Sequence, residues 1–328
     1  MILLNPGPTN TRFMTKLHQW IGSDKCHREN DFKEILISLQ EKLLSKVFLG
    51  KAGRIAIMGG SGTTAMEAMI SSLVPDGVSI INAGSYGERA ISILETFKIK
   101  HKIICSKTID DLSYNENIKF VYFVENETST CEHYSLKNMC QIYPNAKFFI
   151  DATSSFGASD YCADYLDRIA ALSFCSNKCL QSTPGLGIVI WNGETNTYKR
   201  SFYGDLDKYG TGKLPFTLPV QSVHALEYTV SKNSSNKEAF DARRDRLIKA
   251  LSSFGIVCLN KYPANSIIAF RHPNKAYDQL HSFLKNKGII IYSGTGRVDN
   301  SFRISTMSIK FDKSFNKIIG ALHDSCLS

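Results

Sequence analysis

The chain has 328 residues, of which 43% are hydrophobic and 21% are charged, and its formal net charge is +9 at pH 7. This length suits one large and one smaller domain, and the ordinary charged fraction excludes a globally disordered protein. Its lysines are scattered rather than gathered in a basic block. We therefore expect a small molecule, for which an anion would suit the charge, rather than a nucleic acid as the partner.

The nine cysteines form no repeated C-x-x-C pair, and many sit in apolar runs, as Cys105 and Cys175 do. This pattern is typical of reduced thiols in a cytoplasmic protein, and it argues against a disulfide framework or a zinc site. The opening stretch "MILLNPGPTN" is too short in apolar residues for a signal peptide. No run approaches the roughly 18 apolar residues of a membrane span, so we expect no membrane partner. The cysteine pattern likewise leads us to expect no metal.

From Arg54 onward, short apolar runs alternate with amphipathic segments, which predicts βα units around a buried, mostly parallel sheet. Only a short link separates the last two predicted strands. If they are neighbours they must be antiparallel, because a parallel crossover needs about a dozen residues or more. The predicted strands are 54–58, 77–83, 101–105, 118–124, 146–150, 169–175 and 185–191, and the predicted helices are 63–74, 88–97 and 135–143.

The linker-like stretch "SKNSSNKEAF" at 231–240 precedes a different pattern of elements, typical of a smaller α+β unit. We predict a large domain over 15–230 and a small C-terminal domain over 231–328, and the sequence leaves open which of them residues 1–14 pack on. The small domain is predicted to hold helices at 242–255, 277–288 and 314–327 and strands at 266–272, 289–294 and 301–306.

Open α/β sheets bind ligands beyond the carboxyl ends of their strands, so the residues that follow each strand are candidates. In "MGGSGTTAME", Gly62, Thr63 and Thr64 fall at a predicted helix start, where N–H groups and hydroxyls could bind a phosphate. A plain helix cap, with Thr64 and Glu67 as a capping box, is the alternative. The stretch fits neither the P-loop nor the dinucleotide pattern.

Three further strand ends carry polar or aromatic residues. Tyr86, flanked by glycines, could stack on a planar cofactor or simply pack on loop backbone. The cluster 125–129 either lines a cleft or forms a solvated loop. Asp151 directly follows an apolar run, where a carboxylate needs a cation such as a protonated ring nitrogen, or else caps the following turn.

Lys178 lies in the link between two apolar strands, where it is either a solvated turn residue or an amine placed for chemistry. Alone, it favours the solvated turn. Together with a phosphate cradle, a stacking ring and a strand-end aspartate, it completes the set of groups that pyridoxal 5'-phosphate requires. The ordered set favours a site for that cofactor, although none of its members is specific alone.

The sequence resembles the class V, fold-type I aminotransferases over nearly its whole length, and within them it is most like the 2-aminoethylphosphonate–pyruvate aminotransferases. The most specific of the stretches that carry the likeness is "SNKCLQSTPG", which separates this group from alanine–glyoxylate relatives. The others are "LLNPGPTNT", "GGSGTTAMEA", "SYGER", "FIDATSSFG", "PFTLPVQSVHAL" and "SFRIST".

The resemblance implies a role for each matching residue. Lys178 would form the Schiff base with the cofactor and act as general base and acid, and Asp151 would pair with the pyridine nitrogen. Arg303 would bind the acidic group of the substrate. The other matching positions would hold the cofactor: Gly62, Thr63 and Thr64 the phosphate, Tyr86 the ring, Thr128 the phenolic-oxygen side, and Thr217 the phosphate of the neighbouring subunit, which implies a homodimer.

The activity implied is transfer of an amino group from 2-aminoethylphosphonate to pyruvate, which gives phosphonoacetaldehyde and alanine. A transaminase for another small amine or amino acid, of the serine–glyoxylate type or acting on a phosphorylated amino alcohol, remains an alternative. A cysteine desulfurase or lyase, or a cofactor-binding protein without turnover, are further alternatives. Two departures bear on substrate choice: Cys131 stands where glycine is common, and "FRISTMS" replaces the common "FRIGNIG".

Overall fold

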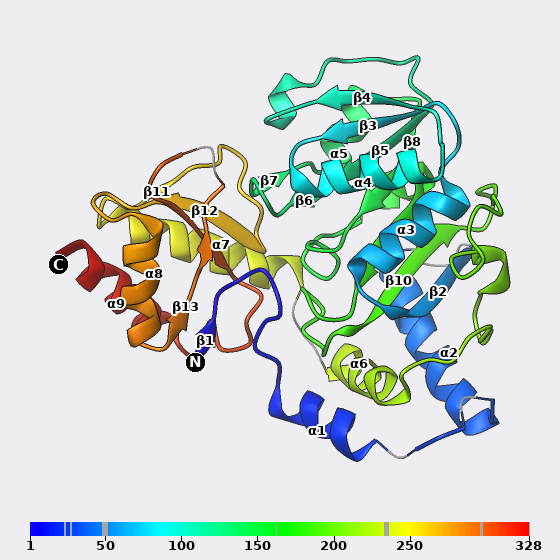
Figure 1. The fold of residues 1–328 in the computed structure, drawn as a ribbon, viewed down its shortest axis with the longest axis horizontal. Coiled ribbons are helices and arrows are strands. Elements are labelled where there is room, and N and C mark those ends of the chain that lie inside the picture. Colours follow the sequence, from blue (N-terminus) through cyan, green and yellow to red (C-terminus); the bar gives the residue numbers. More distant parts are fainter. Residues whose placement is uncertain are drawn as a thin grey trace.

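The computed structural model describes residues 1–22, 24–26, 28–47, 52–161, 163–232, 236–295 and 298–327. A seven-stranded sheet forms the centre of the larger unit (Figure 1). Its neighbours run parallel except β10, which is antiparallel to both of its partners. In sheet order the strands are β2 (Gly53–Gly60), β10 (Gly185–Asn192), β9 (Ile169–Cys175), β8 (Lys147–Asp151), β5 (Phe120–Val124), β3 (Val78–Asn82) and β4 (His101–Cys105).

The mostly parallel sheet and its antiparallel last pair confirm the predicted fold class. Both faces of the sheet are covered, which is why its central strands read as continuous apolar runs; all seven residues of β9 are buried. On one face pack α3 (Gly62–Leu73) and α4 (Ser85–Thr96). On the other pack α2 (Asn30–Leu44), α5 (Leu136–Ile142) and α6 (Val220–Lys232), and α1 (Phe13–Ile21) lies against α6.

The smaller unit is built on an antiparallel sheet of β11 (Val257–Cys258), β12 (Ile267–Arg271), β15 (Ser301–Ser305) and β14 (Tyr292–Ser293). Its helices are α7 (Lys237–Ser252), α8 (Tyr277–Asn286) and α9 (Phe315–Leu327), and its apolar core is separate from that of the larger sheet. Between the sheets lie the short strands β6 (Asn126–Glu127) and β7 (Glu132–His133). Short 3₁₀ turns occur at Ile109–Asp111, Ala163–Arg168 and Leu206–Lys208.

The N-terminal residues pack on the smaller unit before the chain crosses to the larger one (Figure 1). β1 (Ile2–Leu3) pairs in parallel with β13 (Ile289–Ile290), and the side chains of Ile2 and Leu4 are buried in the smaller core. The chain then passes to α1 and α2. Residues that are first in sequence are therefore tied to a strand that lies close to the end.

The fold differs from the sequence prediction in one divided strand and in several helices. The run 289–294, predicted as one strand, is divided, because 289–290 pair with β1 whereas Tyr292 and Ser293 pair with β15 in another sheet. Helices α1, α2 and α6 were not predicted, although the buried residues Phe32, Leu36, Leu39 and Leu43 of α2 recur at helical spacing. Within the described ranges, none of the helices combines the length and the apolar character needed to cross a membrane.

Candidate active site

A cavity of about 180 Å³ is lined by residues that follow the carboxyl ends of β2, β3, β8 and β9. It brings together the phosphate-loop residues, the tyrosine, the aspartate and the lysine that the sequence singled out, from four separate strand ends. The lining residues are Ser61, Gly62, Thr63, Met66, Tyr86, Arg89, Asp151, Thr153, Cys175, Asn177 and Lys178. The order of the parallel strands places these groups at one edge of the sheet.

Helix α3 points its N-terminus into this cavity, and Gly62 and Thr63 form its first turn. Free N–H groups there favour an anion. A Cβ built on Gly62 would come within 2.9 Å of the Thr153 methyl group, so the space requires glycine. Thr64 does not face the cavity: its hydroxyl accepts a hydrogen bond from the Ser61 N–H at 3.1 Å. The capping box therefore joins Ser61 and Thr64, and the predicted box of Thr64 with Glu67 was wrong.

Asp151 ends β8 and is buried, with 1% of its surface exposed. Its Oδ1 accepts hydrogen bonds from the Thr153 amide at 2.9 Å and from the Thr153 hydroxyl at 2.5 Å. Burial raises the pKa of Asp151 to about 6, and the two bonds from Thr153 oppose that rise. Asp151 therefore both caps the following turn and lines the cavity, so the two alternatives given for it in the sequence are found together.

Lys178 is half-buried in the link between β9 and β10 and points into the cavity. Its Nζ donates a hydrogen bond to the Pro6 carbonyl at 2.6 Å. The next residue, Gly7, approaches so closely that a Cβ there would lie 2.8 Å from Nζ, and its φ of +149° also favours glycine. The solvated-turn alternative for Lys178 is therefore excluded, and the N-terminal segment is a part of the site.

Tyr86 lines the cavity from the first turn of α4, and the Arg89 guanidinium lies over its ring at 4.8 Å. Arg89 also donates to the Thr63 hydroxyl at 3.0 Å, so it bridges the starts of α3 and α4. Glu127, which is fully buried, accepts bonds from the Tyr86 and Gly87 amides at 3.2 and 3.1 Å. A carboxylate at a helix N-terminus is favourable, and here it fixes the backbone that carries Tyr86.

Arg303 lies in the middle of β15 and is 7% exposed. Its Nε donates to the Ser293 carbonyl at 2.6 Å and its Nη1 to the Thr128 carbonyl at 2.5 Å, while the guanidinium lies 4.7 Å from the centre of the Tyr292 ring. Arg303 therefore connects the smaller sheet to the loop between β6 and β7. The hydroxyl of Thr128 pairs with that of Ser154 at 2.8 Å.

Four predicted residues, Thr64, Thr128, Thr217 and Arg303, are not among those that line the cavity within the described part of the chain. Thr128 is buried beside Ser154, and Thr217 is exposed on the loop before α6. Their predicted contacts with the cofactor, that of Thr217 being in a neighbouring subunit, stay predictions. Cys131 has a φ of 59°, a left-handed conformation that glycine adopts most easily, which gives a physical reason for glycine at this position.

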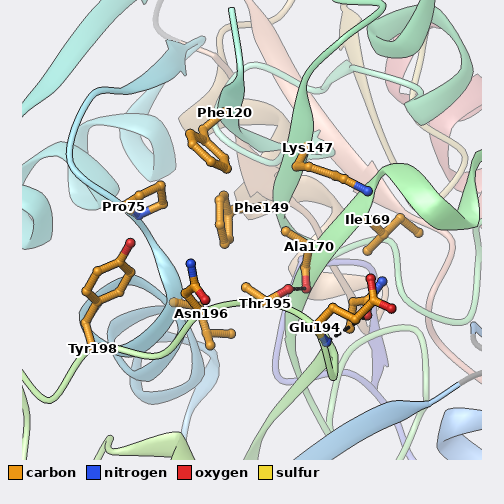
Figure 2. Close-up of a pocket in the computed structure, with 12 residues that line it drawn as sticks. Pro75, Phe120, Lys147, Phe149, Ile169, Ala170, Glu194, Thr195, Asn196 and Tyr198 are labelled. Atoms are coloured by element: carbon orange, nitrogen blue, oxygen red, sulfur yellow. Dashed lines mark hydrogen bonds between the residues drawn. The ribbon is translucent and has the colours of Figure 1, made fainter.

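Other cavities lie away from this chemistry. One of about 500 Å³ includes Glu125 and His133, and burial raises the pKa of Glu125 and lowers that of His133 to about 4. Another, of about 180 Å³, lies at the opposite edge of the sheet, where Asn196 points between Tyr198 and Phe149 (Figure 2). It is lined largely by strand starts and apolar rings, and it contains none of the groups predicted to act.

Comparison with known proteins supports the resemblance. The chain is 28% identical to the 2-aminoethylphosphonate–pyruvate transaminase of Phocaeicola vulgatus, over 98% of both chains. An aspartate aminotransferase from Thermus thermophilus superposes with a TM-score of 0.88 at 19% identity, over 99% of both chains. The chain has the fold of the fold-type I aminotransferases. No protein-family model matches the sequence.

A further neighbour with this aminotransferase fold is the pyridoxal phosphate-bound phosphoserine aminotransferase of Trichomonas vaginalis, with a TM-score of 0.75 at 14% identity, over 97% of this chain and 98% of that one. Within the fold, sequence reasoning missed the roles of Pro6, Arg89, Glu127 and Thr153. Pro6, Arg89 and Glu127 act through bonds to residues far away in the sequence, and Thr153 through bonds to the Asp151 side chain two residues before it, which residue type alone does not reveal. The proline and glycine run "NPGPT" was the one signal that pointed to Pro6.

Proposed function

We propose that the protein is a pyridoxal phosphate-dependent transaminase that moves the amino group of 2-aminoethylphosphonate to pyruvate. The observation that carries the proposal is the meeting of Lys178 and Asp151 in one cavity at the N-terminus of α3. Full-length similarity to transaminases named for this reaction supports the choice of substrates. The products would be phosphonoacetaldehyde and alanine.

The residues that line the cavity fit this cofactor. Gly62 and Thr63 offer a helix N-terminus to the phosphate, and the bare Gly62 leaves room that any Cβ would fill. Tyr86 would contact the ring, and the buried Asp151 would face its nitrogen. When bound, pyridoxal phosphate supplies a carbonyl for the amine and a ring that accepts an electron pair from the neighbouring carbon.

Lys178 would hold the cofactor and then move the proton. Its Nζ takes a proton from the amine-bearing carbon of the substrate and returns it to the cofactor side. Pro6 orients this amine, because its carbonyl accepts a hydrogen bond from Nζ at 2.6 Å. Asp151 in its ionised form would keep the ring nitrogen protonated.

Arg303 would bind the acidic group of both substrates. A guanidinium recognises phosphonate and carboxylate oxygens through paired donors, so one residue can serve the amine donor and the keto acid in turn. The bonds from Nε and Nη1 to two backbone carbonyls fix the plane of the group. The substrate therefore meets a donor that is already oriented.

Absorption of the purified protein tests the cofactor. We expect visible absorption that is yellow in the wild type and absent in Lys178→Ala, and a colourless wild type after addition of pyridoxal phosphate would refute the proposal. A panel of amines then tests the substrate by single-turnover bleaching. Bleaching by serine or a phosphorylated amino alcohol, with none by 2-aminoethylphosphonate, would select the alternative transaminase.

We further propose a cytoplasmic homodimer with active sites at the subunit interface. Thr217 is exposed on the loop before α6, and the neighbouring α1 exposes Phe13, Trp20 and Ile21. Such apolar side chains favour contact with a second copy. The eight cysteines that the structure describes are unpaired, which suits a reducing compartment. Light scattering that gives the mass of a monomer at micromolar concentration would contradict the dimer.

A further inference from the structure

Thr153 lies between two parts of the site, Asp151 and the start of α3 at Gly62. Its hydroxyl lies 2.5 Å from Oδ1 of Asp151, and its amide lies 2.9 Å from the same oxygen. Its methyl group faces Gly62, since a Cβ at Gly62 would come within 2.9 Å of it. The side chain thus has its hydroxyl against the aspartate and its methyl group against the phosphate cradle.

Both of these hydrogen bonds go to Oδ1 of Asp151, so the two oxygens of the carboxylate are not equivalent. A carboxylate that rotated about its Cβ–Cγ bond would break two bonds at once, one of them short. Since Asp151 is 1% exposed, water cannot replace those bonds cheaply. The geometry therefore fixes which oxygen remains for another donor.

We propose that Thr153 is a positioning residue that holds Asp151 by one oxygen and thereby presents Oδ2 to the ring nitrogen of the cofactor. This inference rests on the proposed function and assigns a role within it that the sequence did not suggest. The methyl group of Thr153 has a second role, because it fills the space next to Gly62 and restricts the backbone at the start of α3.

Several ionisable groups interact with Asp151, and together with Thr153 they set its pKa. Burial and the charge of Glu127 favour the neutral form of the aspartate, whereas Thr153 and Lys178 favour the ionised form. Only the ionised form would accept a hydrogen bond from the protonated ring nitrogen while keeping it protonated. The groups that interact with Asp151 are Tyr86 of α4, Tyr122 of β5, Glu127 of β6, Cys175 of β9 and Lys178 of the following link.

Two substitutions separate the hydroxyl from the rest of the side chain. Thr153→Val keeps the shape and removes the hydroxyl, and Thr153→Ser keeps the hydroxyl and removes the methyl group. The affinity of each variant is measured by absorbance titration with pyridoxal phosphate and with an analogue that has C–H in place of the ring nitrogen. We expect Thr153→Val to weaken binding of pyridoxal phosphate about 10-fold and to leave the analogue unchanged. Thr153→Ser should stay close to the wild type.

Equal affinities of Thr153→Val and Thr153→Ser for pyridoxal phosphate would overturn the inference, and so would equal weakening of the cofactor and its analogue, which would indicate packing alone. A second measurement needs no cofactor. The ¹³C shift of the Asp151 carboxyl, assigned with Asp151→Asn, is followed against pH in both variants. We expect a higher midpoint in Thr153→Val, and identical midpoints would overturn the role of Thr153 even if the protein bound no cofactor. Failure of the wild type to bind pyridoxal phosphate would instead refute the proposed function.

Discussion

Lys178 and Arg303, the cations assigned to the amine chemistry and to recognition of the acid, are held in different ways. Lys178 meets one carbonyl, that of Pro6, through a flexible chain. Arg303 is fixed by two carbonyls and lies over the Tyr292 ring. A group that forms and breaks a covalent bond needs to exchange its partner, whereas a group that orients a substrate benefits from being fixed beforehand. The contrast separates a reacting side of the site from a binding side.

The largest expected effect comes from removing the reacting amine. Lys178→Ala should lower kcat by about 1,000-fold or more, because proton transfer by a positioned base commonly contributes about 10² to 10⁴. Steady-state turnover of 2-aminoethylphosphonate with pyruvate measures the loss. Lys102→Ala, at an exposed position of β4, is the control and should be unchanged. Turnover by Lys178→Ala within 10-fold of the wild type would remove the lysine from its role.

A smaller effect is expected on the binding side. Arg303→Lys keeps the charge and loses the paired donors, so kcat/KM for the acidic substrates should fall about 10- to 100-fold while cofactor absorption persists. Arg271→Lys, in the exposed part of the adjacent strand β12, is the matched control. An unchanged kcat/KM in Arg303→Lys would transfer acid recognition to another residue.

The ionised form of Asp151, which dominates above about pH 6, should lower the stability of the cofactor-free protein. Burial raises its pKa from 3.8 to about 6, so the folded protein binds the proton more tightly than the unfolded chain does. The contribution of the protonated Asp151 to the free energy of unfolding is therefore complete below pH 3.8 and is lost as the pH rises through about 6. At pH 8, Asp151→Asn should be more stable than the wild type by up to about 3 kcal/mol.

Urea unfolding at several pH values measures this difference, which should vanish near pH 4. Asp245→Asn, on the exposed side of α7, provides a control without a buried carboxylate. The same Asp151→Asn protein should bind pyridoxal phosphate more weakly. A variant that was less stable than the wild type at pH 8 would contradict the cost assigned to this buried charge.

The smallest expected effect concerns the left-handed residue in the loop between the two sides. Cys131→Gly relieves a positive φ but removes a buried side chain that packs on Ile267 and Ala269. We expect these terms to cancel to within about 1 kcal/mol. Lys98→Gly, at an exposed position with a φ of 54°, gains the relief alone and should be stabilised. Thermal unfolding compares the two, and equal gains in both variants would show that the thiol packing contributes little.

The same contrast explains what could be predicted from the sequence. The reacting side is built at one edge of a parallel sheet, so Gly62, Tyr86, Asp151 and Lys178 could be found as residues that follow apolar strands. The binding side depends on contacts between units, and one of the two carbonyls that hold Arg303 is 175 positions away. Neither hydropathy nor residue type marks such a carbonyl.

Resemblance supplied the position of Arg303 but not its environment. In the same way, the apolar run 289–294 signalled extended chain, yet its two halves pair with different strands. Local pattern fixes the conformation of a short segment, whereas its partner is decided by the packing of the whole molecule. This is why all seven strands of the large sheet were predicted, whereas the junction between the units was not.

The pairing of β1 with β13 couples the position of the smaller unit to the position of the Pro6 carbonyl. Ile2 and Leu3 are anchored in the smaller unit, and three residues later the Pro6 carbonyl reaches the reacting amine. A rotation of the smaller unit that brought Arg303 toward a bound acid would therefore displace the acceptor of Lys178 as well. Binding of the substrate by Arg303 and release of the Lys178 amine from the Pro6 carbonyl would then occur together.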